Sequence, residues 1–298
     1  MRRADAARLV PLAAIWGASF LFTRISAPVL GPVLTAELRT LIAGSALAAY
    51  FAATGYDPQL RRFARQYVIV GILTSGLPFL LWAYAALSLT AGLMSVLNAT
   101  SPMWGALWSV VLLRERMSTG QVLGLVIGIT GVALVTQPQP GQAISYAAVC
   151  AALGAAFCYG LAGGYMKRWA SDAPSRGMAV GTQLAAGVLL APFIALSPPA
   201  AAPTPLVAAS MLALGLVCGA IAYLLYFRLV ADIGATGALT VTYLIPVFGV
   251  LWGALFLGEA VSLFTLAGAG LVILGTVLVL MQPGARIRRA SRRPQGPV

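Results

Sequence analysis

Few side chains in this chain are of the types that catalyse reactions or bind metals. The sequence has no histidine, only seven acids, and three cysteines. Cys150, Cys158 and Cys218 all lie in apolar runs, which removes the usual zinc and Cys/His catalytic sites. No phosphate-binding loop of the Gly-x-x-x-x-Gly-Lys type is present, and no Gly-x-Ser-x-Gly elbow. We therefore expect no enzyme, metal, cofactor or ATP-driven pump.

The side chains able to contact a small solute are polar and aromatic groups inside long apolar runs. A polar side chain in a membrane span normally faces the interior of the helix bundle, where it lines a cavity or bonds to another helix. Aromatic rings there either pack or line a cavity. The predicted substrate-binding residues are Trp16, Tyr84, Asn98, Ser101, Tyr159, Tyr226, Thr242 and Tyr243.

Two prolines, Pro102 and Pro246, lie inside apolar runs. A proline in the middle of a helix removes a backbone hydrogen bond and kinks the helix. We expect both to be helix kinks. The kink either serves packing alone or opens a cavity and exposes a carbonyl.

Charged residues near the predicted helix ends have two possible uses. Ser118 and Gln121 have the spacing of a capping box, and a carboxylate near a helix start complements its exposed amides. The helix-turn residues predicted to be structural are Glu115, Ser118, Glu259 and Ser262. Candidates for an external gate are Arg24, Glu37 and Arg39, with a simple interfacial ion pair as the alternative.

Many of these residues belong to a stretch that occurs twice. Residues 91–135 align without a gap on residues 235–279, and the match holds through several uncommon residue types. The pairs are Pro102 with Pro246, Gly105 with Gly249, Trp108 with Trp252, Glu115 with Glu259, Ser118 with Ser262, Gly124 with Gly268, and Gly131 with Gly275. We interpret this as an internal duplication.

Composition indicates that a bilayer surrounds most of the chain. The 298 residues are 60% hydrophobic and 9% charged, whereas soluble domains have about 25% charged residues. Apolar runs of about 17–25 residues are long enough to span a membrane. The ten predicted spans are residues 9–27, 34–54, 66–87, 90–113, 119–136, 145–166, 177–196, 206–228, 235–257 and 262–281.

Lysines and arginines predict the orientation, since they favour the cytoplasmic side. With ten spans, 17 of the 19 lie on the side of the termini, and only Arg24 and Arg39 lie on the other. Both termini are therefore predicted to be cytoplasmic. The basic tail 284–298 then needs no nucleic acid, and it serves topology or lipid contact.

Five spans per half place the second half upside down relative to the first. The predicted fold is an all-α integral membrane protein of ten transmembrane helices, built as two inverted five-helix repeats around a central cavity. The first repeat is residues 1–137, an external linker is 138–144, and the second repeat is 145–283. Because no acid lies at the middle of a span, we expect transport that does not strictly require a proton gradient.

The pattern resembles the EamA branch of the drug/metabolite transporter superfamily. The resemblance rests on Trp16-Gly17-x-x-Phe20, on the proline of the fourth span, and on Leu113-x-Glu115 before a glycine-rich span. The unit from Pro246 to Gly275 is similar to the family's second repeat, although Arg114 stands where that repeat has Gly258. The resemblance implies a central cavity and export of small metabolites. Within the family, the chain is most similar to YddG-type exporters of aromatic and neutral amino acids.

The sequence is compatible with three functions, one of which is disfavoured. The first is a secondary transporter in the bacterial inner membrane that exports a small organic solute, with amino acids as the preferred substrate and the lipid bilayer as surroundings, acting as a monomer or homodimer. A multidrug exporter or lipid-linked sugar flippase of the same fold is the second. An intramembrane enzyme is disfavoured, because acid/base or metal groups at membrane depth are missing.

Overall fold

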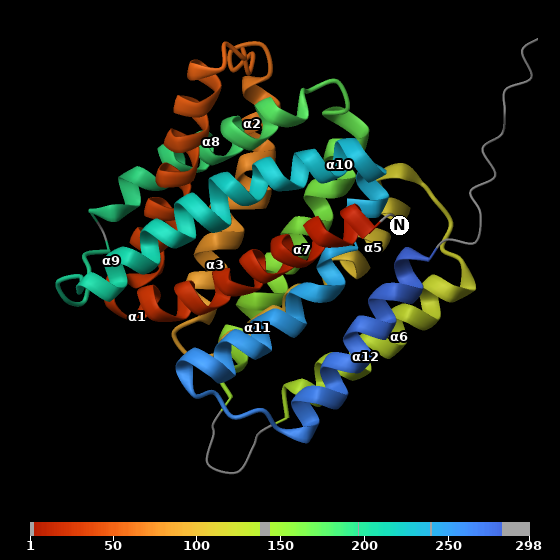
Figure 1. Ribbon diagram of the computed structural model, residues 1–298. Helices are drawn as coiled ribbons and strands as arrows, with labels where there is room; N and C mark the ends of the chain where they lie inside the picture. The colour runs from red at the N-terminus through yellow and green to blue at the C-terminus, as the bar shows by residue number, and fades with distance from the viewer. Residues whose placement is uncertain (1–2, 138–143, 196, 239, 282–298) are drawn as a thin grey trace, which may run out of the picture.

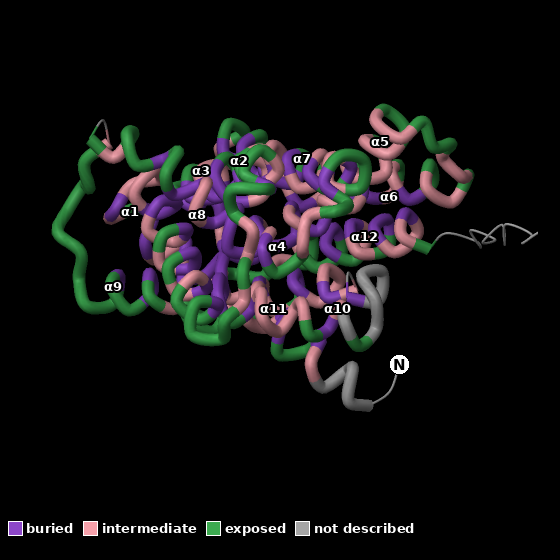
Figure 2. The backbone as a smooth tube through the Cα atoms, turned by 90° about the horizontal axis from the view of Figure 1, so that it is seen from above, coloured by how far each residue is buried: buried purple, intermediate pink, exposed green. Residues whose placement is uncertain are grey.

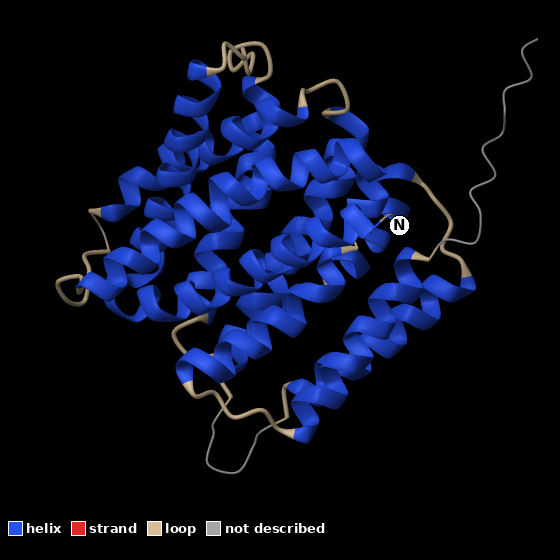
Figure 3. Ribbon diagram, viewed as in Figure 1, coloured by secondary structure: helices blue, strands red, loops and turns tan. Residues whose placement is uncertain are grey.

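The structure is a computed structural model that describes residues 3–137, 144–195, 197–238 and 240–281. Most of the predicted linker 138–144 and the basic tail 284–298 lie outside these ranges. Within them, helices joined by loops form the whole fold, with no strand (Figure 3). Seven helical segments are long and apolar enough to cross a membrane, and two shorter apolar helices accompany them. The prediction of an all-helical, multi-pass membrane protein is confirmed.

The first helix, α1, runs from Arg3 to Ala53 and is broken at Gly31, where φ is 77° and ψ is 163°. The next residue is a proline, which disfavours the helical conformation of the residue before it. Glycine adopts the positive φ without steric cost. The Thr35 hydroxyl donates to the Gly31 carbonyl at 2.7 Å, and the Ala200 N–H donates to the Val29 carbonyl at 3.0 Å. These bonds satisfy carbonyls near the break, so α1 consists of two helical arms.

The remaining helices are joined by short connections (Figure 1). Two runs, α2–η1–α3 and α9–η2–α10, are continuous helices with a π-helical stretch in the middle. The bounds are α2 Ala64–Gly71, η1 Ile72–Gly76, α3 Leu77–Ala85, α4 Ala91–Asn98, α5 Ser101–Leu113, α6 Thr119–Val135, α7 Tyr146–Trp169, α8 Ser175–Ile194, α9 Pro205–Leu212, η2 Ala213–Ile221, α10 Ala222–Ala238, α11 Val241–Leu257 and α12 Leu263–Leu280.

The two repeat-matched prolines are accommodated differently. Pro102 lies just after the start of α5, which is separated from α4 by a short turn. Because proline has no N–H, the Asn98 carbonyl loses its helical donor, and the Ser101 hydroxyl donates to it instead, at 2.6 Å. Pro246 lies inside α11, which continues through it. The two copies of this stretch therefore differ in local helix geometry.

Buried residues run through the middle of the bundle (Figure 2). The largest hydrophobic cluster joins α1, α3, α4 and α7, and it includes Phe20, Trp82, Met94, Leu97 and Val149. The α6 and α12 helices lie side by side in both Figure 1 and Figure 2 and pack more extensively on each other than on the other helices. Their close approach uses glycines, since a Cβ added at Gly275 would lie 2.5 Å from the Gly124 carbonyl oxygen.

Candidate central cavity

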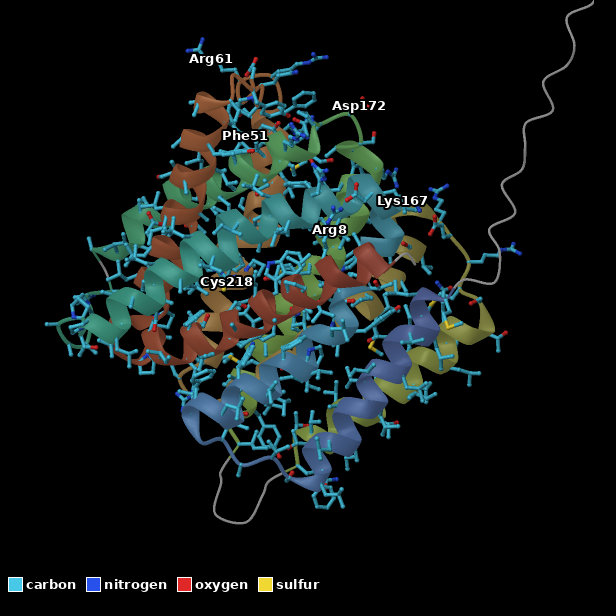
Figure 4. The ribbon with its side chains drawn as sticks, in the orientation of Figure 1. Arg8, Phe51, Arg61, Lys167, Asp172 and Cys218 are labelled. Carbon is cyan, nitrogen blue, oxygen red and sulfur yellow. The ribbon has the colours of Figure 1, made fainter. Side chains whose placement is uncertain are left out.

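A cavity of about 780 Å³ lies within the bundle. Helices from both halves of the chain line it, including α1, α4 and α5 from the first half and α7, α10 and α11 from the second. Figure 4 shows Cys218, one of its lining residues, in the interior of the bundle, and Lys167, another, nearer the edge. The volume is that of a ligand pocket for a small organic molecule.

Six of the eight predicted substrate-binding residues line this cavity. They are Trp16, Asn98, Ser101, Tyr159, Tyr226 and Thr242. The proline of α5 lines it too, so the interruption of the helix lies at the cavity wall. The other residues that line the cavity near Asn98 carry hydroxyl, amide and aromatic groups.

Tyr84 and Tyr243 are not among the residues that line the cavity. Tyr84 is 44% exposed on α3. The offset that aligns the two copies, carried back to α3, matches Tyr226 with Trp82 and not with Tyr84.

An aromatic wall forms one side of the cavity. The Trp16 ring lies 5.5 Å from that of Tyr226, centroid to centroid, and 6.5 Å from that of Tyr223. Both tyrosines line the cavity. Sequence analysis missed Tyr223, although its spacing of three residues from Tyr226 places the two on one helix face. Such a wall suits the apolar part of a solute.

The predicted gate residues do not pair with one another among the described residues. The Arg24 guanidinium donates to the Ala86 carbonyl at 2.7 Å. Glu37 is fully buried, and neither carboxylate oxygen has a hydrogen-bond partner within the described part of the chain. Arg39 lines the cavity and lies over the Phe79 ring, 3.7 Å from its centroid. Only Arg39 of the three reaches the cavity.

Two polar groups lie at the periphery of the cavity lining. The Lys167 ammonium donates to the Glu115 carboxylate at 2.6 Å, and both residues line the cavity.

Ser118 and Gln121 form a reciprocal capping box at the start of α6. Ser262 caps α12 by accepting from the Thr265 N–H at 3.1 Å. These bonds hold the two matched turns that follow α5 and α11.

Glu259 has a different partner from the one expected. We expected it to complement the start of the helix that follows it. Its carboxylate instead accepts from the backbone N–H groups of Ala91 and Gly92, at 2.7 and 3.1 Å, at the start of α4. The role remains that of a helix cap, but the capped helix lies in the other half of the chain.

Comparison with known proteins gives one family. Residues 9–137 and 146–281 match the EamA-like transporter family. A protein of Bacillus subtilis (strain 168) named "Uncharacterized transporter YvbV" is 30% identical over 271 residues, which are 90% of this chain and 88% of that protein. An "Uncharacterized transporter" of Archaeoglobus fulgidus is 25% identical over 89% of this chain and 94% of its own length.

A solved structure titled "Crystal structure of protein" has a TM-score of 0.65 with this chain, at 20% identity. The alignment covers 93% of this chain and 96% of that one, which supports the fold. The names of the family and of both relatives describe transporters and no enzyme. With the family match covering both halves, the chain belongs to the EamA-like transporter family.

Proposed function

We propose that this chain is a secondary transporter that exports small organic metabolites, with aromatic and neutral amino acids as the preferred class. The observation that carries the proposal is the central cavity, to which both halves contribute aromatic, hydroxyl and amide side chains. Alternating access requires that the two halves rock about a site open to one side at a time. A site built from both halves meets that requirement.

The helix lengths support the proposal of ten membrane crossings. The apolar segment Arg8–Ala53 has 46 residues, and a straight helix of that length would measure about 69 Å. That is more than twice the hydrocarbon thickness of about 30 Å, so we assign its two arms, which meet at Gly31, to separate crossings. With this second arm and the two shorter apolar helices, the seven apolar segments make ten proposed crossings.

Glycine contacts support the inverted repeat. The alignment of the two copies pairs Gly124 with Gly268 and Gly131 with Gly275. In the structure Gly124 contacts Gly275, and Gly131 contacts Gly268. A two-fold exchange of the copies converts one contact into the other. The family match also falls in two segments, residues 9–137 and 146–281, which agrees with the proposed repeats.

A second pair of contacts agrees with the proposed repeat. A Cβ added at Gly17 of α1 would meet the backbone at Gly249 of α11, 3.0 Å from its nitrogen. A Cβ added at Gly160 of α7 would meet Gly105 of α5, 2.6 Å from its nitrogen. Gly105 and Gly249 are matched in the alignment. In the proposed repeat, the packing of α1 on α11 then corresponds to the packing of α7 on α5.

We further propose the bacterial inner membrane with cytoplasmic termini. In Figure 1 the connections 54–63 and 170–174 lie toward the upper edge, and 197–204 and 258–262 lie toward the left and lower edges. Arg61 and Lys167, labelled in Figure 4, lie on the upper and right-hand side. The basic end of the bundle is the cytoplasmic one by the positive-inside rule.

The test is flux in sealed proteoliposomes with labelled phenylalanine, tryptophan, leucine and threonine. We expect saturable flux for at least one of them, and about a fivefold or larger loss in Trp16→Ala and Asn98→Ala, which remove cavity contacts. Tyr146→Ala is the matched control, because Tyr146 is 63% exposed on α7. Folded wild-type protein without flux for any of the four would overturn the amino-acid assignment.

A further inference from the structure

We propose that Arg39 recognises a carboxylate of the transported solute, and that the cavity does not require the solute to carry an ammonium group. The inference rests on the proposed transport function and specifies the chemistry of its substrate. Arg39 belongs to the second arm of α1, eight residues after the break at Gly31, and lines the cavity together with Ala43, one turn further along.

Arg39 lacks a counter-charge in the described part of the chain. It takes part in none of the ion pairs there, and its buried Nε has no hydrogen-bond partner. Glu37 is two residues away, and positions i and i+2 do not face each other on a helix. Glu37 is also absent from the cavity lining. The guanidinium lies over the Phe79 ring, 3.7 Å from its centroid.

Glu115, the one acid among the lining residues, does not serve as that counter-charge. Its carboxylate accepts from the Lys167 ammonium at 2.6 Å. Arg39 therefore leaves the cavity with one uncompensated positive charge, because Glu115 and Lys167 cancel. An unpaired cation at membrane depth destabilises the protein, because the charge loses its hydration without gaining a partner. A ligand that supplies the negative charge removes this cost, and such residues commonly mark substrate sites in membrane proteins.

Gln183 of α8 gives independent support for a ligand. Its side chain is 1% exposed, it lines the cavity, and neither its amide oxygen nor its amide nitrogen has a hydrogen-bond partner among the described residues. The Tyr223 hydroxyl lies near this amide without completing a hydrogen bond of normal geometry. A buried amide with both polar atoms unpaired is rare in a finished core. A bound solute would satisfy it.

Arg39 and its neighbours have the donors that a carboxylate needs. The planar guanidinium binds a carboxylate through two parallel hydrogen bonds. The Tyr159 and Tyr223 hydroxyls lie within electrostatic range of the guanidinium and also line the cavity. Trp16 packs against Tyr223, so the aromatic wall begins beside the proposed anion site. The solute is then an organic acid with an apolar or aromatic body, and amino acids satisfy this description.

The experiment compares ligands that differ only in their charged groups. Binding of L-phenylalanine, 3-phenylpropionate and 2-phenylethylamine to purified protein in lipid nanodiscs is measured by tryptophan fluorescence and calorimetry, with leucine, 4-methylpentanoate and 3-methylbutylamine as the aliphatic set. We expect the acids to bind with or without the amino group, and the amines to bind at least tenfold more weakly. Tight binding of an amine, or equal binding of acid and amine, overturns the inference.

Variants then assign the effect to Arg39. Arg39→Gln is expected to weaken acid binding about 10- to 100-fold, the range for one lost charge-assisted contact. Arg176→Gln is the control, because Arg176 also lies near a ring, that of Tyr56, at 5.7 Å, but is exposed. If Arg39→Gln does not fold, Arg39→Lys and Gln183→Leu each should weaken acid binding severalfold.

The outcomes separate the inference from the proposed function. Saturable flux of an amino acid that is unchanged in folded Arg39→Gln, Arg39→Lys and Gln183→Leu would leave the transporter in place and overturn the carboxylate site. Binding and flux of the acids without any flux of amino acids would support the carboxylate site and overturn the amino-acid assignment. Failure of every acid to bind the wild-type protein overturns the inference.

Discussion

The Glu259 carboxylate accepts a 2.7 Å hydrogen bond from the backbone N–H of Ala91, 168 residues away along the chain. A second bond, from Gly92, joins the same carboxylate to α4. The first amides of a helix have no partner within it, and their dipole favours a negative charge. Glu259 therefore ties the turn after α11 to the start of α4, across the two halves.

Glu259→Ala should lower the free energy of unfolding by about 2 kcal/mol, since two amides lose a charged acceptor. Glu259→Gln should cost less, because its amide oxygen still accepts a bond. Glu115→Ala is the matched comparison. Its pair with Lys167 is 42% and 61% exposed at the two side chains, and exposed pairs contribute about 0–1 kcal/mol. The free energy of unfolding of the three variants is measured in detergent. An equal loss in Glu115→Ala and Glu259→Ala would contradict the expected difference between the two carboxylates.

The α6–α12 contact gives a prediction with a control on the same helix. In Gly275→Ala the new Cβ would meet the Gly124 carbonyl at 2.5 Å, so the helices must separate. We expect a loss of about 1–3 kcal/mol in unfolding free energy. A Cβ at Gly270 meets nothing within 4 Å, and Gly270→Ala should be neutral or stabilising by up to about 1 kcal/mol. Equal effects of the two substitutions would mean that this close approach does not support the fold.

Orientation can be tested by labelling single cysteines in a background without the native three. A cysteine at Pro199 should react with an impermeant thiol reagent added outside intact cells, and one at Gln59 should react only after lysis. The reason is the arginine bias, which places the connection 54–63 inside and 197–204 outside. Reversed labelling would overturn the orientation, and equal labelling of both would contradict the number of crossings between them.

Sequence periodicity and composition predicted the helices well, since apolar length and breakers are local properties. The turn at Arg114 has the same backbone conformation as the matched turn of the second copy. Arg114 has φ 56° and ψ 30°, and its matched residue Gly258 has φ 65° and ψ 24°. The backbone of the turn is therefore kept although an arginine replaces the glycine.

Contacts between residues far apart in the chain could not be predicted from the sequence. The bonds from Glu259 to α4 depend on how the two halves pack, and no local pattern encodes them. The same holds for Arg39, whose position near a span end suggested an interfacial gate, whereas the break at Gly31 and the packing of the second arm of α1 bring it to the cavity. Tyr84 does not line the cavity, and the offset of the repeat matches Tyr226 with Trp82 instead.

The last prediction concerns Glu37 and energy coupling. We expect Glu37→Gln to fold and to transport at the wild-type rate, because glutamine keeps the shape of a side chain that is fully buried and outside the cavity lining, and that has no hydrogen-bond partner among the described residues. An ionised carboxylate there would lack any compensating charge. Glutamine removes that cost, so the free energy of unfolding of Glu37→Gln should equal or exceed that of the wild type.

The measurement is substrate flux in sealed proteoliposomes with and without an imposed pH gradient. We expect wild type, Glu37→Gln and the exposed control Asp57→Asn to equilibrate the substrate at similar rates, with no accumulation above the equilibrium level in either condition. A neutral zwitterion moving down its own gradient needs no coupling ion. Accumulation driven by the pH step and lost only in Glu37→Gln would show that this buried carboxylate carries a proton during transport.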